Sequence, residues 1–99
     1  IAANDGYLLQ YVKELGIPCL GIEPTKSTAN TAREKGLEIV EDFFGVDLAI
    51  QLVKQGKQAD LIVANNVLAH VADINDFVLG WFKIIYVIKP LIFCYSLSR

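Results

Sequence analysis

The chain begins with a run of residues that combines a carboxamide, a carboxylate and a glycine. The run reads IAANDGYLL, so Asn4, Asp5 and Gly6 stand between an apolar start and an apolar segment with helical spacing. One acidic residue, Glu23, then ends the next apolar run, CLGIEP. A strand, a glycine turn, a helix and an acidic residue at the end of the second strand are typical of a site for a ribose-containing ligand. Glu23 is therefore predicted either to accept hydrogen bonds from two ribose hydroxyls or to be a solvated residue before Pro24.

The turn separates two classes of ribose ligand. A dinucleotide requires its pyrophosphate at the bare positive end of the helix, where glycines let the backbone approach. Here Ala2 and Asn4 occupy the positions of the first two glycines, and Asp5 brings a carboxylate to the start of the helix. That carboxylate would repel phosphate, and it is also well placed to cap the helix. The turn favours S-adenosylmethionine, which carries an ammonium and a sulfonium, over a nicotinamide dinucleotide.

The elements that must position these residues alternate between strands and helices. Apolar runs bounded by turn residues predict strands at the chain start and over residues 19–22, 37–40, 60–64 and 91–95. Apolar residues at helical spacing predict helices over residues 7–15, 47–54 and 74–86, and from a cap at Ser27 or Thr28 through Glu34. This alternation predicts the α/β class with a doubly wound, mostly parallel sheet. Because such sheets bind ligands outside the carboxyl ends of their strands, the polar residues at those ends form the candidate site.

Composition limits the function classes. The 99 residues are 54% apolar and 20% charged, which suits one small domain over residues 1–99. The net charge of −2 gives no basic field for a nucleic-acid backbone, so a small-molecule ligand is expected. Cys19 and Cys94 have no second Cys or His at metal-ligand spacing. We therefore expect no metal, and we expect both cysteines to be buried core thiols in a reducing cytoplasm.

The ends of the chain read as cut, and no targeting segment is visible. A start at Ile1, inside a strand and without a methionine, suggests that upstream sequence is missing. No basic region followed by a long apolar stretch indicates a signal peptide. The most membrane-like stretch, residues 77–95, contains Lys83, Lys89 and Pro90. These residues disfavour a membrane span and favour a helix followed by a buried strand.

Four segments together resemble a known family. IAANDGYLL, LGIEPT, EDFFG and ADLIVANNVLAHVADINDFV are similar to the cofactor-binding core of S-adenosylmethionine-dependent methyltransferases. The similarity is greatest to the C-methyltransferases that act on nucleotide-linked deoxysugars in antibiotic pathways, and it covers about residues 1–90. The NDG turn and the NNVLAHV run are its more specific features. The resemblance implies a class I, Rossmann-like methyltransferase core, incomplete at both ends, with S-adenosylmethionine as the cofactor and a nucleotide sugar as the substrate.

The resemblance also implies a role for the residues of the opening turn. Ala3, Asn4, Asp5 and Gly6 would line the methionine end of the cofactor, and Glu23 would hold the ribose. The protein would then orient the sulfonium methyl group toward a carbanion formed next to a ketone of the sugar. Placement of the two reactants would supply most of the rate gain.

Two further strand ends complete the site that the resemblance implies. Asp42 would accept a hydrogen bond from the adenine amino group. Phe43 would lie against the adenine ring unless it is an ordinary core aromatic, and its neighbour Phe44 can take only one of these two roles. Asn65 and Asn66 would end a strand beneath the methionine moiety, where at least one is expected to donate or accept a hydrogen bond. The alternative is that the two asparagines satisfy backbone groups of a loop.

His70 is the single imidazole of the chain and a candidate catalytic base. It could assist in removing a proton alpha to the ketone, but a packed or substrate-contacting role is the alternative. The family's best base candidates lie in a segment beyond this core, and its N-terminal cysteine cluster for zinc has no counterpart in Cys19 or Cys94. We therefore expect the chain to lack a complete substrate pocket and to be inactive alone.

Two other functions stay open at this point. The first is half of an NAD-dependent oxidoreductase, which the missing glycines and Asp5 disfavour. The second is a truncated, non-catalytic interaction module. Its apolar segment, residues 77–95, would self-associate or pack on a partner, because a sheet cut at one edge leaves a strand to be covered.

Overall fold

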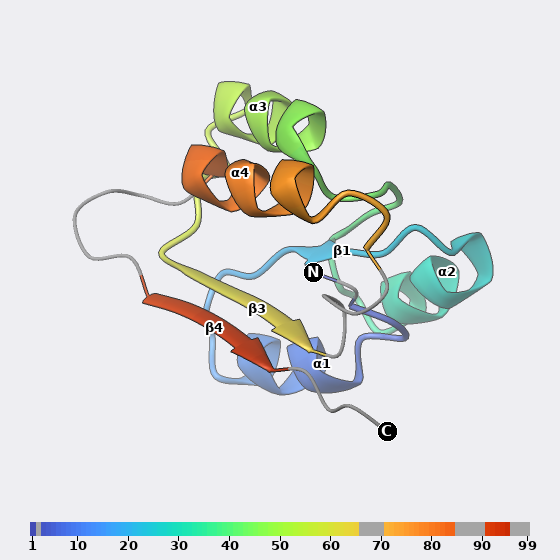
Figure 1. Ribbon diagram of the computed structural model, residues 1–99. Coiled ribbons are helices and arrows are strands. Elements are labelled where there is room, and N and C mark those ends of the chain that lie inside the picture. The colour runs from blue at the N-terminus through green and yellow to red at the C-terminus, as the bar shows by residue number, and fades with distance from the viewer. Residues whose placement is uncertain (2, 66–70, 85–90, 96–99) are drawn as a thin grey trace. The chain divides into compact units, whose positions relative to one another are not determined.

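The structure, a computed structural model, describes residues 1, 3–65, 71–84 and 91–95. Helices and strands alternate along these residues, and β1 pairs in parallel with β2. β3 pairs in parallel with β4 (Figure 1). This pattern confirms the predicted α/β class and corresponds to part of a Rossmann-like fold. In chain order the elements are α1 (Tyr7–Glu14), β1 (Gly21–Ile22), α2 (Lys26–Glu34), β2 (Ile39–Val40), α3 (Val46–Lys54), β3 (Leu61–Asn65), α4 (Ile74–Ile84) and β4 (Leu91–Tyr95).

The first of two compact units, Ile1–Phe43, contains α1, β1, α2 and β2. β1 pairs with β2 over two residues of each strand. Ala29 and Ala32 come from α2 and lie on one face of it, because residues three apart are neighbours on a helix. The core of this unit consists of Ala29, Ala32, Leu37 and Ile39, with Ala3 and Leu9 packed against it.

Close packing at β1 requires a glycine. A Cβ atom at Gly21 would meet the side chain of Ile39 and lie 2.9 Å from the Cβ of Ala3. The amide of Ala3 also donates a hydrogen bond to the carbonyl of Ile22 at 3.0 Å. The chain start therefore lies in direct contact with β1, which brings the residues of the opening turn close to the end of this strand.

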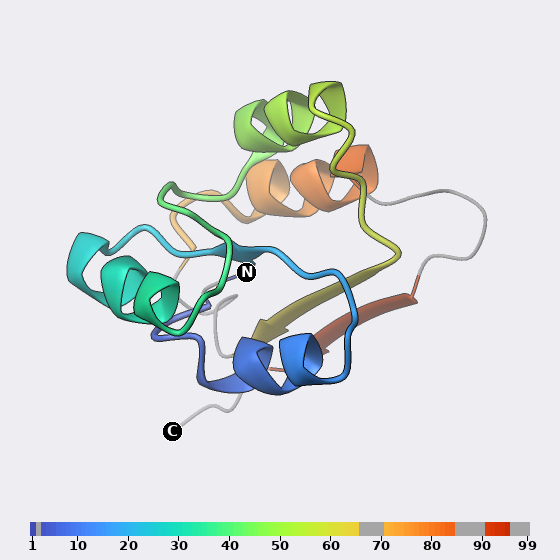
Figure 2. The same cartoon turned by 180° about the vertical axis from the view of Figure 1, so that it is seen from behind.

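The second unit, Phe44–Arg99, contains α3 beside α4 and the parallel pair of β3 and β4 (Figure 1, Figure 2). Phe77, Trp81 and Ile84 of α4 are all buried, as their helical spacing requires of one face. Leu48 and Leu52 are the large buried side chains of α3. The two helices are thus held by apolar faces with regular helical spacing.

Trp81 is the single tryptophan of the chain and lies on the buried face of α4. Its ring packs on the ring of Phe77, with the two centroids 5.3 Å apart. Within the residues that the structure describes, its indole N–H meets no hydrogen-bond acceptor. Apolar packing rather than a polar contact therefore holds this side chain.

Two glycines, Gly45 and Gly80, lie where the start of α3 meets α4. A Cβ atom at Gly80 would lie 2.9 Å from the carbonyl carbon and oxygen of Gly45, and 3.0 Å from the ring of Phe44. A Cβ atom at Gly45 would collide with the carboxylate of Asp76. That carboxylate accepts a hydrogen bond from the amide of Val46 at 3.3 Å. The start of α3 is therefore in backbone contact with α4.

Two strands are shorter than the sequence predicts. The strands predicted over residues 19–22 and 37–40 reduce to β1 and β2, with two residues each. The reason is the pairing itself, because the ladder between the two strands contains two residue pairs. Apolar runs of four residues are consistent with a longer strand, but their local pattern does not specify the partner.

The helix predicted to begin at a hydroxyl cap begins earlier. α2 starts at Lys26, so Ser27 and Thr28 lie inside the helix, and the prediction that one of them caps it is wrong. The carboxylate of Glu23 instead accepts a hydrogen bond from the amide of Thr25 at 2.9 Å. The segment that leads into α2 thus obtains its side-chain acceptor from the end of β1.

The two cysteines were both predicted to be buried core thiols. Cys19 is half-buried and lines a surface pocket together with Lys13 and Pro18, so the prediction is wrong for this residue. Cys94 lies in β4 opposite Ala64, but its side chain is outside what the structure describes. For Cys94 the prediction stays a prediction.

The apolar segment of residues 77–95 contains the larger part of α4 and all of β4, as the sequence predicts. Leu79 and Phe82 of α4 are exposed. Among the residues that the structure describes, no helix has both the length and the apolar character needed to cross a membrane. The exposed side chains on α4 leave self-association through this segment as a prediction.

We expect Gly80→Ala to destabilise the second unit. Overpacking against the Gly45 backbone costs about 1–3 kcal/mol, which exceeds the gain of about 1 kcal/mol in helix propensity. Urea unfolding of the full chain measures the difference. Lys83→Ala, at an exposed position of the same helix, is the matched control and should change the free energy of unfolding by less than about 0.5 kcal/mol. A Gly80→Ala variant as stable as the parent would show that the two segments are not in close contact.

Candidate functional site

The turn before α1 depends on two residues with left-handed backbone conformations. Asn4 has φ of 51° and Gly6 has φ of 79°. Asparagine and glycine are the residues that adopt this region most readily. A Cβ atom at Gly6 would also meet the side chain of Leu37 and lie 3.2 Å from the Cβ of Ala32. The NDG sequence is therefore explained first by backbone geometry and by packing on the core.

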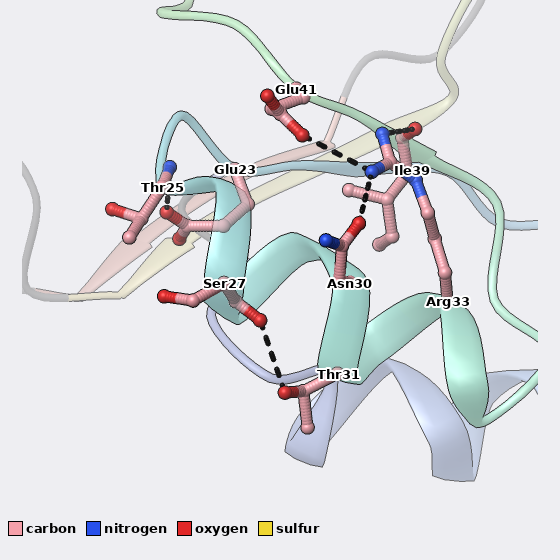
Figure 3. A network of polar contacts seen from close by, with 8 residues as sticks. All are labelled: Glu23, Thr25, Ser27, Asn30, Thr31, Arg33, Ile39 and Glu41. Atoms are coloured by element: carbon pink, nitrogen blue, oxygen red, sulfur yellow. Dashed lines mark hydrogen bonds and ion pairs between the residues drawn. The ribbon is translucent and has the colours of Figure 1, made fainter.

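Glu23 lies at the carboxyl end of β1 and is buried, with 5% of its surface exposed. One carboxylate oxygen, Oε1, accepts a hydrogen bond from the amide of Asn4 at 3.0 Å. The other, Oε2, accepts from the amide of Thr25 at 2.9 Å (Figure 3). The alternative of a solvated residue at the strand end is therefore wrong. The sequence argument also missed this structural role, because the acceptor and Asn4 are 19 residues apart.

The backbone of Glu23 extends the same junction to β2. Its amide donates a hydrogen bond to the carbonyl of Val40 at 3.0 Å, while the amide of Ala3 donates to Ile22. Of the predicted site residues, Asn4 is thus hydrogen-bonded to Glu23 itself, and Ala3 to Ile22, the residue before Glu23. An ionised carboxylate offers about four acceptor positions, and the two amides occupy two of those on Glu23.

The N-cap of α1 is Gly6, so the prediction that Asp5 caps this helix is wrong, although Asp5 does accept from its first amide. Its Oδ1 accepts a hydrogen bond from the amide of Tyr7, the first residue of α1, at 3.1 Å. Its Oδ2 lies 3.7 Å from the ammonium of Lys35. Lys35 offsets part of the charge that the sequence argument assigned to Asp5 alone. The amide of Tyr7 is therefore already occupied by Asp5, whose charge Lys35 partly offsets.

The two adjacent phenylalanines after β2 have different roles. Phe43 is 79% exposed, which rules out the alternative that it is an ordinary core aromatic. Phe44 is half-buried, and its ring contacts the ring of Phe77 edge-on at a centroid distance of 5.6 Å. Asp42 is exposed, and its carboxylate accepts a hydrogen bond from the amide of Phe43 at 2.7 Å. The ring of Phe43 is therefore accessible to a ligand from solvent.

Arg33 is a residue that the sequence analysis did not single out. Its Nη1 donates to the side chain of Asn30 at 2.9 Å and to Glu41 Oε1 at 3.2 Å, while its Nη2 donates to the carbonyl of Ile39 at 3.2 Å (Figure 3). The guanidinium thus connects α2 with β2, through Ile39, and with Glu41, the residue before Asp42. The sequence did contain a signal for this contact. A basic residue, Arg33, lies in the last turn of a predicted helix, and an acidic residue, Glu41, follows the next predicted strand.

Three predicted site residues have no described side chain. Asn65 is the last residue of β3 and pairs with Tyr95, but the structure does not describe its side chain. Asn66 and His70 lie outside the described residues. Among the residues that are described, no group of three or more His, Cys, Asp or Glu side chains could hold a metal ion.

Comparison with known proteins gives a distant similarity and no family assignment. No protein-family model matches the chain. The chain is similar to a curated protein named C-methyltransferase NovU, from Streptomyces niveus, with 23% identity over 78 residues. The aligned part is 79% of this chain and 19% of the relative, so the chain spans about a fifth of that protein's length. A distant and partial similarity of this kind suggests a methyltransferase and says nothing of a substrate.

We expect Glu23→Ala to destabilise the first unit, because it removes the acceptor of two part-buried hydrogen bonds from the amides of Asn4 and Thr25. A hydrogen bond to a charged group contributes about 1.5–3 kcal/mol, and partial exposure of the two amides puts the expected loss at the lower end of that range. Glu23→Gln keeps one acceptor oxygen and should lie between Glu23→Ala and the parent in urea unfolding. Glu34→Ala, at an exposed position of α2, is the control. Equal stabilities for Glu23→Ala and the parent would contradict the junction described above.

Proposed function

We propose that this chain provides the S-adenosylmethionine-binding core of a C-methyltransferase. The observation that carries this proposal is the junction of Glu23 with the Asn4 turn, which puts a carboxylate at the carboxyl end of β1 beside the turn before α1. Rossmann-like folds bind the ribose of a nucleotide cofactor with an acidic residue at that place. The similarity to a C-methyltransferase over 79% of the chain supports methyl transfer as the reaction.

The residues of the junction fit the ribose and the methionine end of this cofactor. The carboxylate of Glu23 would receive the ribose hydroxyls at acceptor positions that the two amides do not use. The left-handed Asn4 and the glycine at position 6 keep the turn compact, so its backbone would line the methionine end together with Ala3. The carboxylate of Asp5 would attract the ammonium and the sulfonium, with Lys35 reducing that attraction.

The residues after β2 fit the adenine. The exposed ring of Phe43 would stack on the base, which would remove an apolar surface from water. The carboxylate of Asp42 would accept a hydrogen bond from the adenine amino group. Asn65, the last residue of β3, and Asn66 are the proposed contacts of the methionine moiety.

The chemistry of the proposed reaction divides between cofactor and protein. Bound S-adenosylmethionine supplies an electrophilic methyl group on a sulfonium. The chain's own residues would fix the adenosine and the methionine so that this methyl group faces the nucleophile, and placement is worth several kcal/mol (about 7–11) in well-oriented reactions. We take the nucleophile to be a carbanion next to a ketone of a nucleotide-linked deoxysugar, with His70 as a candidate for removing the proton.

Ligand choice tests the proposed function directly. In isothermal titration calorimetry on the full chain, we expect S-adenosylhomocysteine to bind at least tenfold more tightly than NAD, because Asp5 occupies the amide that a pyrophosphate would require. Asp5→Asn keeps an acceptor for that amide and removes the charge, so it should reduce the difference in affinity between S-adenosylhomocysteine and NAD. Binding of NAD without binding of S-adenosylhomocysteine would contradict the proposed function and favour an oxidoreductase half-domain.

Phe43→Ala tests the adenine contact separately. We expect it to weaken S-adenosylhomocysteine binding by about 1–3 kcal/mol, the usual loss when an aromatic ring is removed from a base. Stability should change little, because the side chain is 79% exposed. Phe82→Ala removes an equally large ring that is 65% exposed on α4, and it should leave binding unchanged. Equal losses for both variants would argue against a stacking role for Phe43.

A further inference from the structure

The proposed adenine contacts lie on a short segment after β2. Residues 41–43 are all exposed, and they have no regular secondary structure. An exposed segment of this kind pays an entropic penalty when a ligand fixes it, because its backbone must adopt a single conformation. Whatever holds the segment before binding therefore strengthens binding.

Arg33 provides that hold from the neighbouring helix. Its Nη2 donates to the carbonyl of Ile39, inside β2, and its Nη1 donates to the carboxylate of Glu41, just after the strand; both distances are 3.2 Å (Figure 3). One rigid guanidinium thus fixes the strand and the first residue of the segment relative to each other. The side chain of Asn30, one turn earlier on α2, orients the guanidinium by accepting a hydrogen bond at 2.9 Å.

The chemistry of this contact requires arginine. A guanidinium presents several N–H donors in one plane and can serve the carbonyl, the carboxylate and the carboxamide simultaneously. A lysine ammonium is a compact charge on a flexible stem and would not keep all three partners in one arrangement. The helix that carries Arg33 is packed into the core, because Ala29 and Ala32, next to Asn30 and Arg33 on α2, are fully buried.

We propose that Arg33 is a positioning residue that sets adenine specificity. By holding Glu41, it fixes the backbone at Asp42 and Phe43 in the arrangement that meets the amino group and the face of adenine. This inference rests on the proposed function and adds the residue that selects the base. Because the Arg33–Glu41 pair is partly exposed, with side chains 40% and 33% exposed, its loss should affect binding more than folding.

The test compares two ligands that differ at the adenine amino group. S-Adenosylhomocysteine carries that group, and S-inosylhomocysteine carries an oxygen in its place. For the parent chain, calorimetry should show a clear preference for S-adenosylhomocysteine. Arg33→Lys should lower the affinity for S-adenosylhomocysteine by about tenfold and the affinity for S-inosylhomocysteine by less, so that the preference for the adenine ligand falls.

Further variants separate positioning from charge and from folding. Lys26→Gln removes a positive charge from the same helix at an exposed position and should leave the preference unchanged. Glu41→Gln removes the partner's charge at the surface and should reduce the preference as Arg33→Lys does. In a double variant the two losses in preference should not add, because both substitutions weaken the same contact.

The possible results distinguish failure of the positioning role of Arg33 from failure of the proposed function. If the parent binds S-adenosylhomocysteine and both Arg33→Lys and Glu41→Gln keep its affinity and its preference, the positioning role is wrong and the proposed function stands. If the parent binds neither ligand, the proposed function fails, and the role of Arg33 fails with it. A drop in thermal stability with unchanged ligand preference would show that Arg33 has only a structural role.

Discussion

The first unit depends on a buried carboxylate that has backbone amides as its partners. An ionised group with 5% of its surface exposed is unfavourable unless its oxygens are hydrogen-bonded, and Glu23 meets that condition with Asn4 on one side and Thr25 on the other. The same residue joins β2 through its own amide. A change in the chain start, in β1 or in the approach to α2 would therefore disturb the hydrogen bonds that hold all three segments.

This arrangement links folding to the proposed chemistry. The turn that brings Asn4 to Glu23 requires left-handed conformations at Asn4 and Gly6, and its glycine is pressed against Ala32 and Leu37. The polar end of the sheet is thus built by the residues that would meet the cofactor. A residue with both roles cannot be assigned to binding on the evidence of its type and position alone, which is why ligand measurements and unfolding measurements must be made on the same variants.

The sequence predicted what depends on local pattern and missed what depends on distant partners. Helical spacing placed α1, α3 and α4 to within a few residues, and the apolar run at β4 was placed correctly. The burial of Glu23 was not foreseen, since it requires Asn4, and Arg33 was missed because its partners come from α2, β2 and the following segment. Phe43 and Phe44 are the same residue type at adjacent positions, so only the contact of Phe44 with Phe77 could separate them. The predicted roles of Asn65, Asn66 and His70 stay predictions.

The burial of Trp81 has a spectroscopic consequence. It is the single indole of the chain, it belongs to the second unit, and its ring is packed beside Phe77. Its fluorescence emission should therefore follow the packing of α4, while the Glu23 junction, in the first unit, contains no tryptophan. Intrinsic emission and a backbone signal such as far-ultraviolet circular dichroism, recorded during one melt, would reveal whether the two halves of the polypeptide lose their order in a single cooperative step.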